Sequence, residues 1–310
     1  MTIATEGPGL AARTTGAGPS RRRTVKSKRR LAGLWFVLPA MAWLTVFHIA
    51  PMAFGLAISL FDYRMTSEPS FVGLDNYIAL ASNDTFLRSL AITAGYVLGT
   101  VVAVWFFSFA IAMALSRHVR FSGLWKVLLF LPTIVPTITI ALLWIPIFDV
   151  AGPLNALLSL VGIEPVEWLT SPSAAPWAMI LLSWWQAASY YTVMFLSGLQ
   201  AIPDEPAEAA VVDGANALQR FRYITLPAMR PTIGLVVVVS VLNALQTFIF
   251  QNIITGGGPA GSTEIITLLI YRTGFDFLDM GTASAMSVVL FLLTFLVASF
   301  QILLLQRKES

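Results

Sequence analysis

The chain has 310 residues, of which 57% are hydrophobic and 11% are charged, and its mean hydropathy is +0.77. This composition excludes an ordinary soluble domain and predicts an integral membrane protein. The absence of cysteine excludes a disulfide framework and a cysteine-based metal site, and the net charge of +3 says little about ligands.

The N-terminal segment is rich in Gly, Pro, Thr and Ala and ends in a basic run, with seven Lys and Arg residues from Arg21 to Arg30. A secretory signal would need a short apolar core and a cleavage site after this run, but a full-length apolar segment follows. We interpret residues 1–30 as a disordered basic cytoplasmic arm that touches anionic lipid headgroups. Nucleic-acid binding is the alternative use of such a run, and we expect no nucleic-acid partner.

Six long segments without Asp, Glu, Lys or Arg follow the arm. Each can hold the roughly 20 apolar residues that a helix needs to cross a ~30 Å hydrocarbon core. The segments are continuously apolar, without the alternation of a barrel strand. We therefore predict an all-α membrane protein with six spanning helices, at residues 34–58, 90–115, 124–148, 174–199, 231–254 and 282–305.

The orientation of these spans follows from the basic residues, because Lys and Arg collect on the cytoplasmic side of a membrane. With the N-terminus inside, 16 of the 19 Lys and Arg residues are cytoplasmic, and only Arg64, Arg88 and Arg272 lie outside. Both termini are then cytoplasmic. The chain divides into the arm, one membrane domain at residues 31–306 and a cytoplasmic tail at residues 307–310.

A polar segment at residues 204–227 lies between the fourth and fifth predicted spans, on the cytoplasmic side. The sequence D-E-P at residues 204–206 predicts a helix start, since carboxylates and proline are favoured in the first turn. Gly214 predicts the end of that short helix, because glycine tolerates the left-handed conformation. A second helical stretch at residues 217–224, anchored by Phe221, would complete a stiff elbow outside the membrane.

The sequence E-A-A-x-x-D-G-A at residues 208–215, followed by Phe221, Ile224, Leu226 and Pro227, resembles the cytoplasmic coupling loop of binding-protein-dependent ABC importer permeases. The resemblance extends over residues 34–305 and is to the carbohydrate-uptake type, similar to maltose and glycerol-3-phosphate permease subunits. Its other supports are FVGLDNY at residues 71–77, TGGGP at residues 255–259, and a spaced series of Pro132, Pro136, Trp144, Phe148, Gly152 and Asn155.

This resemblance implies a type I ABC importer permease whose elbow fits a cleft of an ATPase subunit. The implied partners are a second homologous permease subunit, two ATPase subunits, an extracytoplasmic solute-binding protein and membrane lipid. ATP and Mg would be bound by the ATPase subunits, so we expect no cofactor, no metal and no enzymatic activity on this chain. The residues that would couple it to the ATPase are Glu208, Ala209, Ala210, Asp213, Gly214, Ala215, Phe221, Leu226 and Pro227. The alternative, an amphipathic loop lying on headgroups, explains neither Gly214 nor the Ala-Ala pair.

Polar residues recur at helical spacing within two of the predicted spans. Amides are expensive in hydrocarbon, so they should face the bundle interior or a water-filled cavity. Amides, hydroxyls and aromatic faces suit a polyhydroxylated solute. An equally weighted alternative is hydrogen bonding between neighbouring helices. The candidate pathway residues are Ser240, Asn243 and Gln246 in the fifth span and Trp185, Gln186 and Tyr190 in the fourth.

We expect the chain to be a subunit of the bacterial inner membrane that moves a sugar or sugar-like solute with a partner's energy. The segment GGGPAGST at residues 256–263 lacks the lysine of a phosphate loop, and the spans lack the charges of an ion relay. The alternatives are an ABC permease for glycerol-phosphate compounds or another polar metabolite, and an ion-coupled secondary transporter. The prolines of the third span are either hinges or static kinks.

Overall fold

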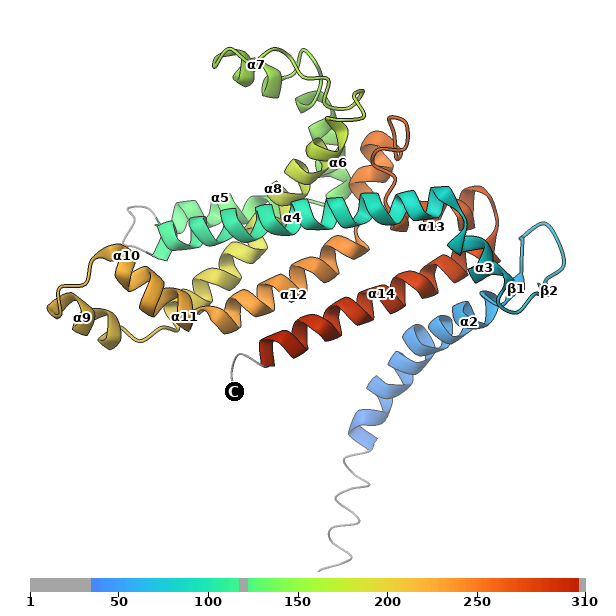
Figure 1. Cartoon of the computed structure of the whole chain (residues 1–310), viewed down its shortest axis with the longest axis horizontal. Coiled ribbons are helices and arrows are strands. Elements are labelled where there is room, and N and C mark those ends of the chain that lie inside the picture. The colour runs from blue at the N-terminus through green and yellow to red at the C-terminus, as the bar shows by residue number, and fades with distance from the viewer. Residues whose placement is uncertain (1–34, 117–121, 307–310) are drawn as a thin grey trace, which may run out of the picture. The chain divides into compact units, whose positions relative to one another are not determined.

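The computed structural model describes residues 35–116 and 122–306, and the predicted arm and tail lie outside the described residues. The described chain is almost wholly helical (Figure 1). It divides into two compact units, of which the first ends at Phe54 and the second begins at Gly55. The elements are η1 (Thr45–Ile49), α2 (Ala50–Ile58), β1 (Phe61–Asp62), β2 (Ser70–Phe71), α3 (Asp75–Ala81), α4 (Asp84–Ser116), α5 (Ser122–Ile134), α6 (Thr137–Ile147), α7 (Pro153–Ser159), α8 (Ala175–Gln200), α9 (Glu205–Val212), α10 (Ala217–Arg220), η2 (Phe221–Thr225), α11 (Leu226–Ala228), α12 (Arg230–Gln246), η3 (Gln251–Thr255), α13 (Ile266–Tyr271), η4 (Arg272–Asp276) and α14 (Met280–Gln306), where η marks a π-helix.

Four helical segments in the described residues are long and apolar enough to cross a membrane: Trp35–Ile58, Asp84–Ser116, Arg230–Thr255 and Met280–Leu305. A bent helix pair would add a fifth. The predicted fourth span corresponds to α8, which has the necessary length and no charged residue but contains many polar and aromatic residues. The helical prediction for these segments is therefore confirmed, whereas the count of six spans does not follow from length and hydropathy alone.

The third predicted span, residues 124–148, is not one continuous helix. It is broken into α5 and α6, whose apolar parts are bent by 106° relative to each other. The break falls at Pro136, whose extended backbone (ψ 136°) precedes the first turn of α6. Proline has no amide hydrogen to donate to the preceding turn, so an interruption at this residue is expected. Pro132 and Pro146, in contrast, lie inside α5 and α6.

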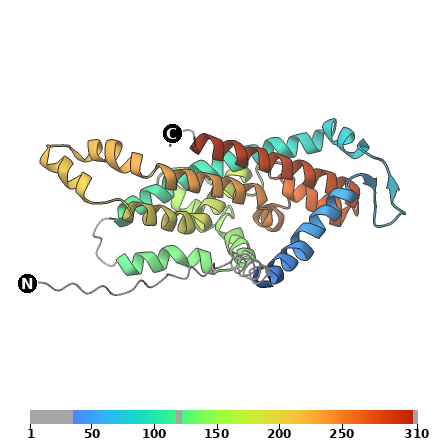
Figure 2. The same cartoon turned by 90° about the horizontal axis from the view of Figure 1, so that it is seen from below.

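Long helices form the core of the second unit. Helices α4, α12 and α14 run side by side in both cartoon views, and α8 packs closely against α4 (Figures 1 and 2). Buried apolar residues make three clusters, of which the largest joins α4, α6 and α8 with the segment after α12. Helix α12 is interrupted at Thr247, whose backbone is extended (ψ 146°), before the chain turns into η3.

The turn after α6 explains the last two residues of the spaced series in the sequence. A side chain at Gly152 would collide with the carbonyl oxygens of residues 146, 147 and 149. Asn155 is buried, and its amide nitrogen donates to the Val166 carbonyl at 2.9 Å. Its oxygen accepts hydrogen bonds from the Val166 backbone amide and the Trp168 indole. These two residues therefore hold residues 149–168 together as one folded segment.

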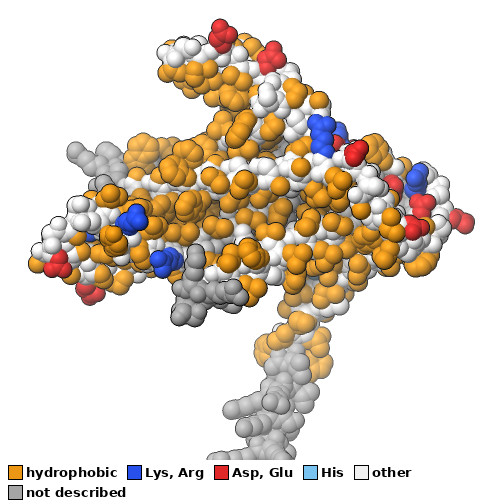
Figure 3. Space-filling view, viewed as in Figure 1, with side chains coloured by type: hydrophobic (Ala, Val, Ile, Leu, Met, Phe, Trp, Pro, Cys, Tyr) orange, Lys and Arg blue, Asp and Glu red, His pale blue; other side chains and the backbone are white. Residues whose placement is uncertain are grey.

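Charged side chains avoid the middle of the second unit. On the face shown in Figure 3, hydrophobic side chains cover the long helices. Acidic and basic side chains gather at α9 and α10, near β1 and β2, and in the segment that follows α7. Such a distribution is the one a lipid-embedded belt with two wet ends requires.

Candidate functional site

The polar segment between α8 and α12 forms the predicted elbow. Helix α9 starts at Glu205, with Asp204 before it and Pro206 in the first turn. Gly214 ends it with φ +82°, and no atom lies within 4 Å of the position where a Cβ would stand. The glycine is therefore required by backbone conformation and not by crowding.

The second arm of the elbow starts with a reciprocal cap. The Asn216 side chain accepts from the Gln219 amide at 2.9 Å, while the Gln219 side chain accepts from the Asn216 amide at 2.8 Å. Such a pair satisfies two amides that the first turn of a helix leaves free. Instead of continuing as an α-helix to Ile224, the chain changes to the π-helix η2 at Phe221. The predicted second stretch is thus helical, but with a local widening at its middle.

Phe221 connects the elbow to the membrane helices. Its ring lies 6.1 Å from that of Phe109 on α4, and Phe109 in turn lies 5.2 Å from Phe195 on α8. The elbow is therefore joined through a row of aromatic rings to the packed pair α4 and α8.

The predicted coupling residues fall into two sets. The outer set is exposed and comprises Glu208, Ala209, Asp213 and Gly214, and the inner set is half-buried and comprises Ala210, Ala215, Phe221, Leu226 and Pro227. Sequence reasoning missed the apolar side chains on the same surface: Val212 is 88% exposed, and Leu218 and Tyr223 are each 72% exposed. Large apolar side chains on a protruding polar loop are typical of a protein contact. Their signal was the occurrence of apolar residues outside any predicted span.

A polar cavity of 260 Å³ lies among α4, α5, α8 and α12. Its wall includes four of the predicted pathway residues, namely Gln186, Tyr190, Ser240 and Asn243, and none of the described residues that line it is charged. Trp185 and Gln246 are not part of this wall. Trp185 packs instead against Trp144, with ring centroids 5.2 Å apart.

The two predicted roles of the intramembrane polar residues were to face a cavity and to form hydrogen bonds between helices, and the same side chains do both. The Asn243 amide donates to the Tyr191 hydroxyl at 3.0 Å, and the Gln186 amide donates to the Thr137 hydroxyl at 3.2 Å. Both bonds join different helices, and both residues also line the cavity. The same side chains therefore hold the helices and offer polar atoms to the space between them.

Sequence reasoning missed the contribution of α4 to the cavity. Tyr96 and Thr100 line it, and the Tyr96 hydroxyl lies 2.6 Å from the Ser183 hydroxyl on α8. The available signal was a series of buried polar residues on one face of α4, at Ser89, Thr93, Tyr96, Thr100 and Ser108. Both broken segments also reach this cavity, through Thr133 beside the α5–α6 break and Thr247 after α12.

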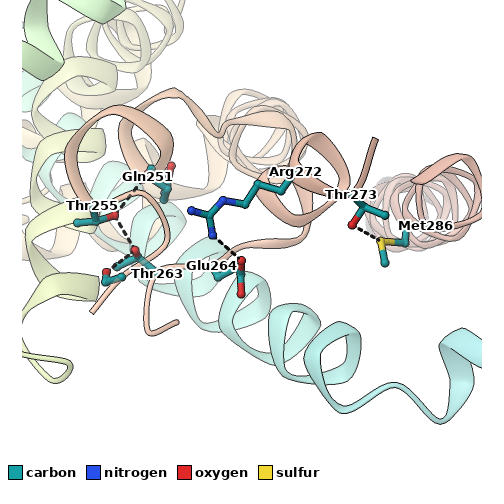
Figure 4. Close-up of polar contacts among 8 residues, drawn as sticks. Gln251, Thr255, Thr263, Glu264, Arg272, Thr273 and Met286 are labelled. Carbon is teal, nitrogen blue, oxygen red and sulfur yellow. Dashed lines mark hydrogen bonds and ion pairs between the residues drawn. The ribbon is translucent and has the colours of Figure 1, made fainter. Parts of the chain in front are cut away.

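The glycine-rich turn after η3 is held by polar contacts (Figure 4). The Thr255 and Thr263 hydroxyls lie 2.6 Å apart, and Thr263 also donates to the Gly258 carbonyl. Arg272 forms a 3.0 Å ion pair with Glu264. Arg88 on α4 donates to the Ala260 carbonyl at 2.8 Å, which ties the turn to the start of that helix.

Comparison with known proteins identifies the family. The model of the family described as "binding-protein-dependent transport system inner membrane component" matches residues 107–310. The probable ABC transporter permease protein YesP of Bacillus subtilis (strain 168) is 36% identical over 290 residues, covering 91% of this chain and 94% of the relative. The trehalose/maltose transport system permease protein MalF of Thermococcus litoralis is 34% identical over 287 residues, covering 91% of this chain and 96% of the relative.

A solved structure shares the fold. It is a bacterial alginate ABC transporter in complex with an alginate pentasaccharide-bound periplasmic protein. One of its chains is 23% identical, with a TM-score of 0.78, and the match covers 91% of this chain and 96% of that one. The helical architecture, the exposed elbow and the family match lead to one conclusion: this multi-pass membrane chain belongs to the inner membrane components of binding-protein-dependent transport systems.

Proposed function

We propose that the chain is the permease subunit of an ATP-driven importer for a sugar or a sugar-like solute, with six spans and both termini in the cytoplasm. The spans would be the four long apolar segments, the bent pair α5 and α6, and α8. Helix α8, the fourth of these spans in chain order, can contain polar residues because part of its length lines the cavity. Consecutive spans then alternate in direction, so the elbow lies on the side opposite to β1 and β2.

The observation that carries the proposal is the elbow of residues 204–227. It presents exposed carboxylates and exposed apolar side chains on a short stiff scaffold, and it is joined to α4 through Phe221. A separate ATPase subunit that closes on ATP would grip Glu208, Asp213 and their small neighbours, and would tilt the packed helices as it moves. This chain has no phosphate-binding lysine motif, so ATP and Mg would be held by that partner.

The proposed solute class rests on the chemistry of the cavity. Its polar lining is made of hydroxyls and amides together with Tyr rings, which suits neutral hydroxyl groups. Two of the three outer arginines are engaged elsewhere, since Arg272 pairs with Glu264 and Arg88 donates to the Ala260 carbonyl. A trehalose/maltose permease among the relatives supports the same class.

The proposed assembly contains a second homologous permease, two ATPase subunits and an extracytoplasmic solute-binding protein. The structurally similar alginate transporter is bound to a periplasmic protein, which supports the last of these partners. In such an assembly the binding protein delivers the solute, and this chain itself catalyses no reaction.

The test is uptake by the complete transporter in proteoliposomes, with the solute-binding protein outside and ATP inside. We expect radiolabelled maltose or trehalose to accumulate with ATP and not with a non-hydrolysable analogue. Uptake that persists without ATP while ion gradients are maintained would identify an ion-coupled transporter instead. Uptake of sn-glycerol 3-phosphate but of neither sugar would move the substrate class to glycerol-phosphate compounds.

A further inference from the structure

Tyr96 stands between two hollows of the second unit. One is the polar cavity of 260 Å³. The other is a larger hollow of 1030 Å³ that extends along α4 and α8 and reaches the loops before α8 and after η3. Tyr96 is the residue that lines both, and its side chain is 6% exposed. Its position is therefore that of a wall between the two spaces.

The hydrogen bonds around Tyr96 leave polar groups unused on both sides of this wall. The Tyr96 hydroxyl bonds to Ser183, and Gln251 and Thr100 lie around the same hydroxyl. Gln251 is 1% exposed, and among the described residues neither its amide nitrogen nor its amide oxygen has a partner with good hydrogen-bond geometry, although its side chain lies near the Tyr96 hydroxyl; the same is true of the Thr100 hydroxyl. Buried polar groups are normally paired, so unpaired groups on both sides of one side chain need an explanation.

Gln251 is held in place by its backbone and not by its side chain. Its carbonyl accepts from the Thr255 hydroxyl at 3.0 Å and from the Gly257 amide at 3.2 Å. Figure 4 shows Gln251 beside Thr255 at the start of the glycine-rich turn. The residue opens the π-helix η3, directly after the break in α12, and such widened turns are frequent at functional sites. The free amide is thus presented by a fixed backbone.

The larger hollow is mostly apolar, but three of its polar side chains, Gln251, Ser262 and Thr263, come from η3 and the glycine-rich turn. Another, Ser173, precedes α8. The Ser262 hydroxyl is buried without a partner, like the Gln251 amide. These side chains offer both donors and acceptors, and the part of the chain that the structure describes contributes no charged side chain to the hollow's wall.

We propose that the solute path continues past Tyr96 to these polar side chains, where the Gln251 amide binds a neutral hydroxyl group of the solute. The Tyr96–Ser183 hydrogen bond closes the passage between the two hollows, and its opening joins them. A primary amide both donates and accepts, as a hydroxyl does, and no Lys or Arg is among the described residues that line the larger hollow, where a phosphate or carboxylate would need one. This inference rests on the proposed transport function and extends it to a second binding position.

The passage can be tested without knowing the solute, because the natural chain has no cysteine. Thr100→Cys is made in the complete transporter, and sealed vesicles receive a membrane-impermeant trimethylammonium thiol reagent on the side of Ser67. We expect labelling to be at least about tenfold faster when Tyr96→Ala is added than when Tyr96 is kept, since a gate shut by a few kcal/mol is rarely open. Tyr96→Phe and Ser183→Ala, which remove only the hydrogen bond, should give intermediate rates.

The control is Ser67→Cys, an exposed position whose labelling rate should not depend on residue 96. Labelling of Thr100→Cys at the same rate with and without Tyr96→Phe or Ser183→Ala would overturn the gate, even if Tyr96→Ala failed to assemble. Gln251→Cys should be labelled from the same side in the presence of ATP. A Gln251→Cys chain that stays unlabelled while Ser67→Cys reacts would overturn the second binding position.

The role of Gln251 in binding is tested by Gln251→Leu. We expect its KM for ATP-driven uptake of maltose or trehalose to rise about five- to tenfold, the worth of one hydrogen bond, with the maximal rate little changed. The matched control is Gln301→Leu, which also removes a buried unpaired amide oxygen but lines neither hollow. An unchanged KM in Gln251→Leu would overturn the binding role. Failure of the wild type to import either sugar would instead count against the proposed substrate class, and the labelling rates would still decide the passage.

Discussion

The backbone conformation of Gly214 sets the direction in which the chain leaves α9 within the elbow. Its φ of +82° is open to glycine, and a residue with a Cβ pays roughly 1–2 kcal/mol for such a conformation. We expect Gly214→Val to reorient α9 and to lower the solute moved per ATP hydrolysed, while the chain still inserts and assembles. The measurement is the ratio of uptake to ATP hydrolysis in proteoliposomes.

Gly162 supplies a matched control for this substitution. It has φ +78° and equally open surroundings, but it lies in the turn after α7. Gly162→Val should leave the ratio of uptake to hydrolysis unchanged. If Gly162→Val and Gly214→Val lower it equally, the effect is one of general strain and the elbow has no special role.

Asn243 is an amide in which the two uses of polar residues coincide, because it bonds to another helix and also lines the cavity. Asn243→Leu removes the hydrogen bond to Tyr191 and one polar group of the cavity. One such bond is worth about 0.5–1.5 kcal/mol, so we expect uptake to fall by up to about tenfold while the ATPase subunits still assemble. Gln246→Leu, almost one turn further and outside the cavity wall, should transport normally. Equal uptake by both variants would remove Asn243 from the path.

The residues of the elbow were predictable because their constraints are local. A glycine that ends a helix and a proline in a first turn depend on neighbours in the sequence, and both were found where they were expected. The cavity was only half predictable. Ser240 and Asn243 follow from helical spacing, but Tyr96 and Thr100 reach the same space only because α4 packs against α8. Spacing also placed Gln246 on the cavity face, yet α12 ends at Gln246, the backbone is extended at Thr247, and the cavity is lined by Thr247 and not by Gln246.

At the scale of elements, the contact between η2 and α4 joins the elbow to the long membrane helices through two aromatic rings. Phe221 faces Phe109, and Tyr223, two residues on, is exposed. An aromatic pair is worth about 0.5–1.5 kcal/mol beyond its burial, so Phe221→Ala should weaken transmission from the elbow by up to about tenfold. We expect ATP hydrolysis to continue and uptake to fall.

Tyr223→Ala is the control for that substitution, because it removes an aromatic ring from the same π-helix without touching α4. Where the ATPase subunit covers Tyr223, this substitution should weaken binding of the ATPase subunit. It should lower the ratio of uptake to ATP hydrolysis less than Phe221→Ala does. Normal coupling in Phe221→Ala would show that the elbow transmits force by another route.

The broken third span shows what proline positions can and cannot predict. Three prolines indicated a bent segment, and the chain does bend, by 106°. Only Pro136 stands at the break, whereas Pro132 and Pro146 remain inside helices. The difference lies in tertiary contacts: the Ser189 hydroxyl of α8 donates to the Leu129 carbonyl of α5, and Gln186 of α8 donates to Thr137 of α6. Contacts to a distant helix are invisible to sequence spacing, so neither the angle nor the choice of proline could be predicted.

At the scale of the whole molecule, the proposed topology puts Asp213 and Ser67 on opposite sides of the membrane. Both are exposed, and each can be made the sole cysteine of the chain. We expect an impermeant thiol reagent added outside intact cells to label Ser67→Cys and to leave Asp213→Cys unlabelled until the membrane is opened. Labelling of both from outside would contradict the six-span arrangement, and with it a cytoplasmic elbow.

The hydropathy of the chain predicted its class and most of its helices, because lipid requires every spanning backbone to bond internally. It could not count the spans by itself, because α8 exchanges apolar residues for polar ones where it meets the cavity. The helix that contributes most residues to the cavity is therefore one that hydropathy alone does not identify as a span.

The end of α14 also matters to anyone handling the protein. Gly234 on α12 is buried, and a Cβ there would overlap the terminal methyl groups of Leu305 on α14, so that the Leu305 side chain would have to move. The final turn of α14 thus packs closely against the first turns of α12, the helix that follows the elbow. Affinity tags or fluorescent fusions should consequently be joined after Gln306, since truncation before Leu305 would loosen the foot of the helix that leaves the elbow.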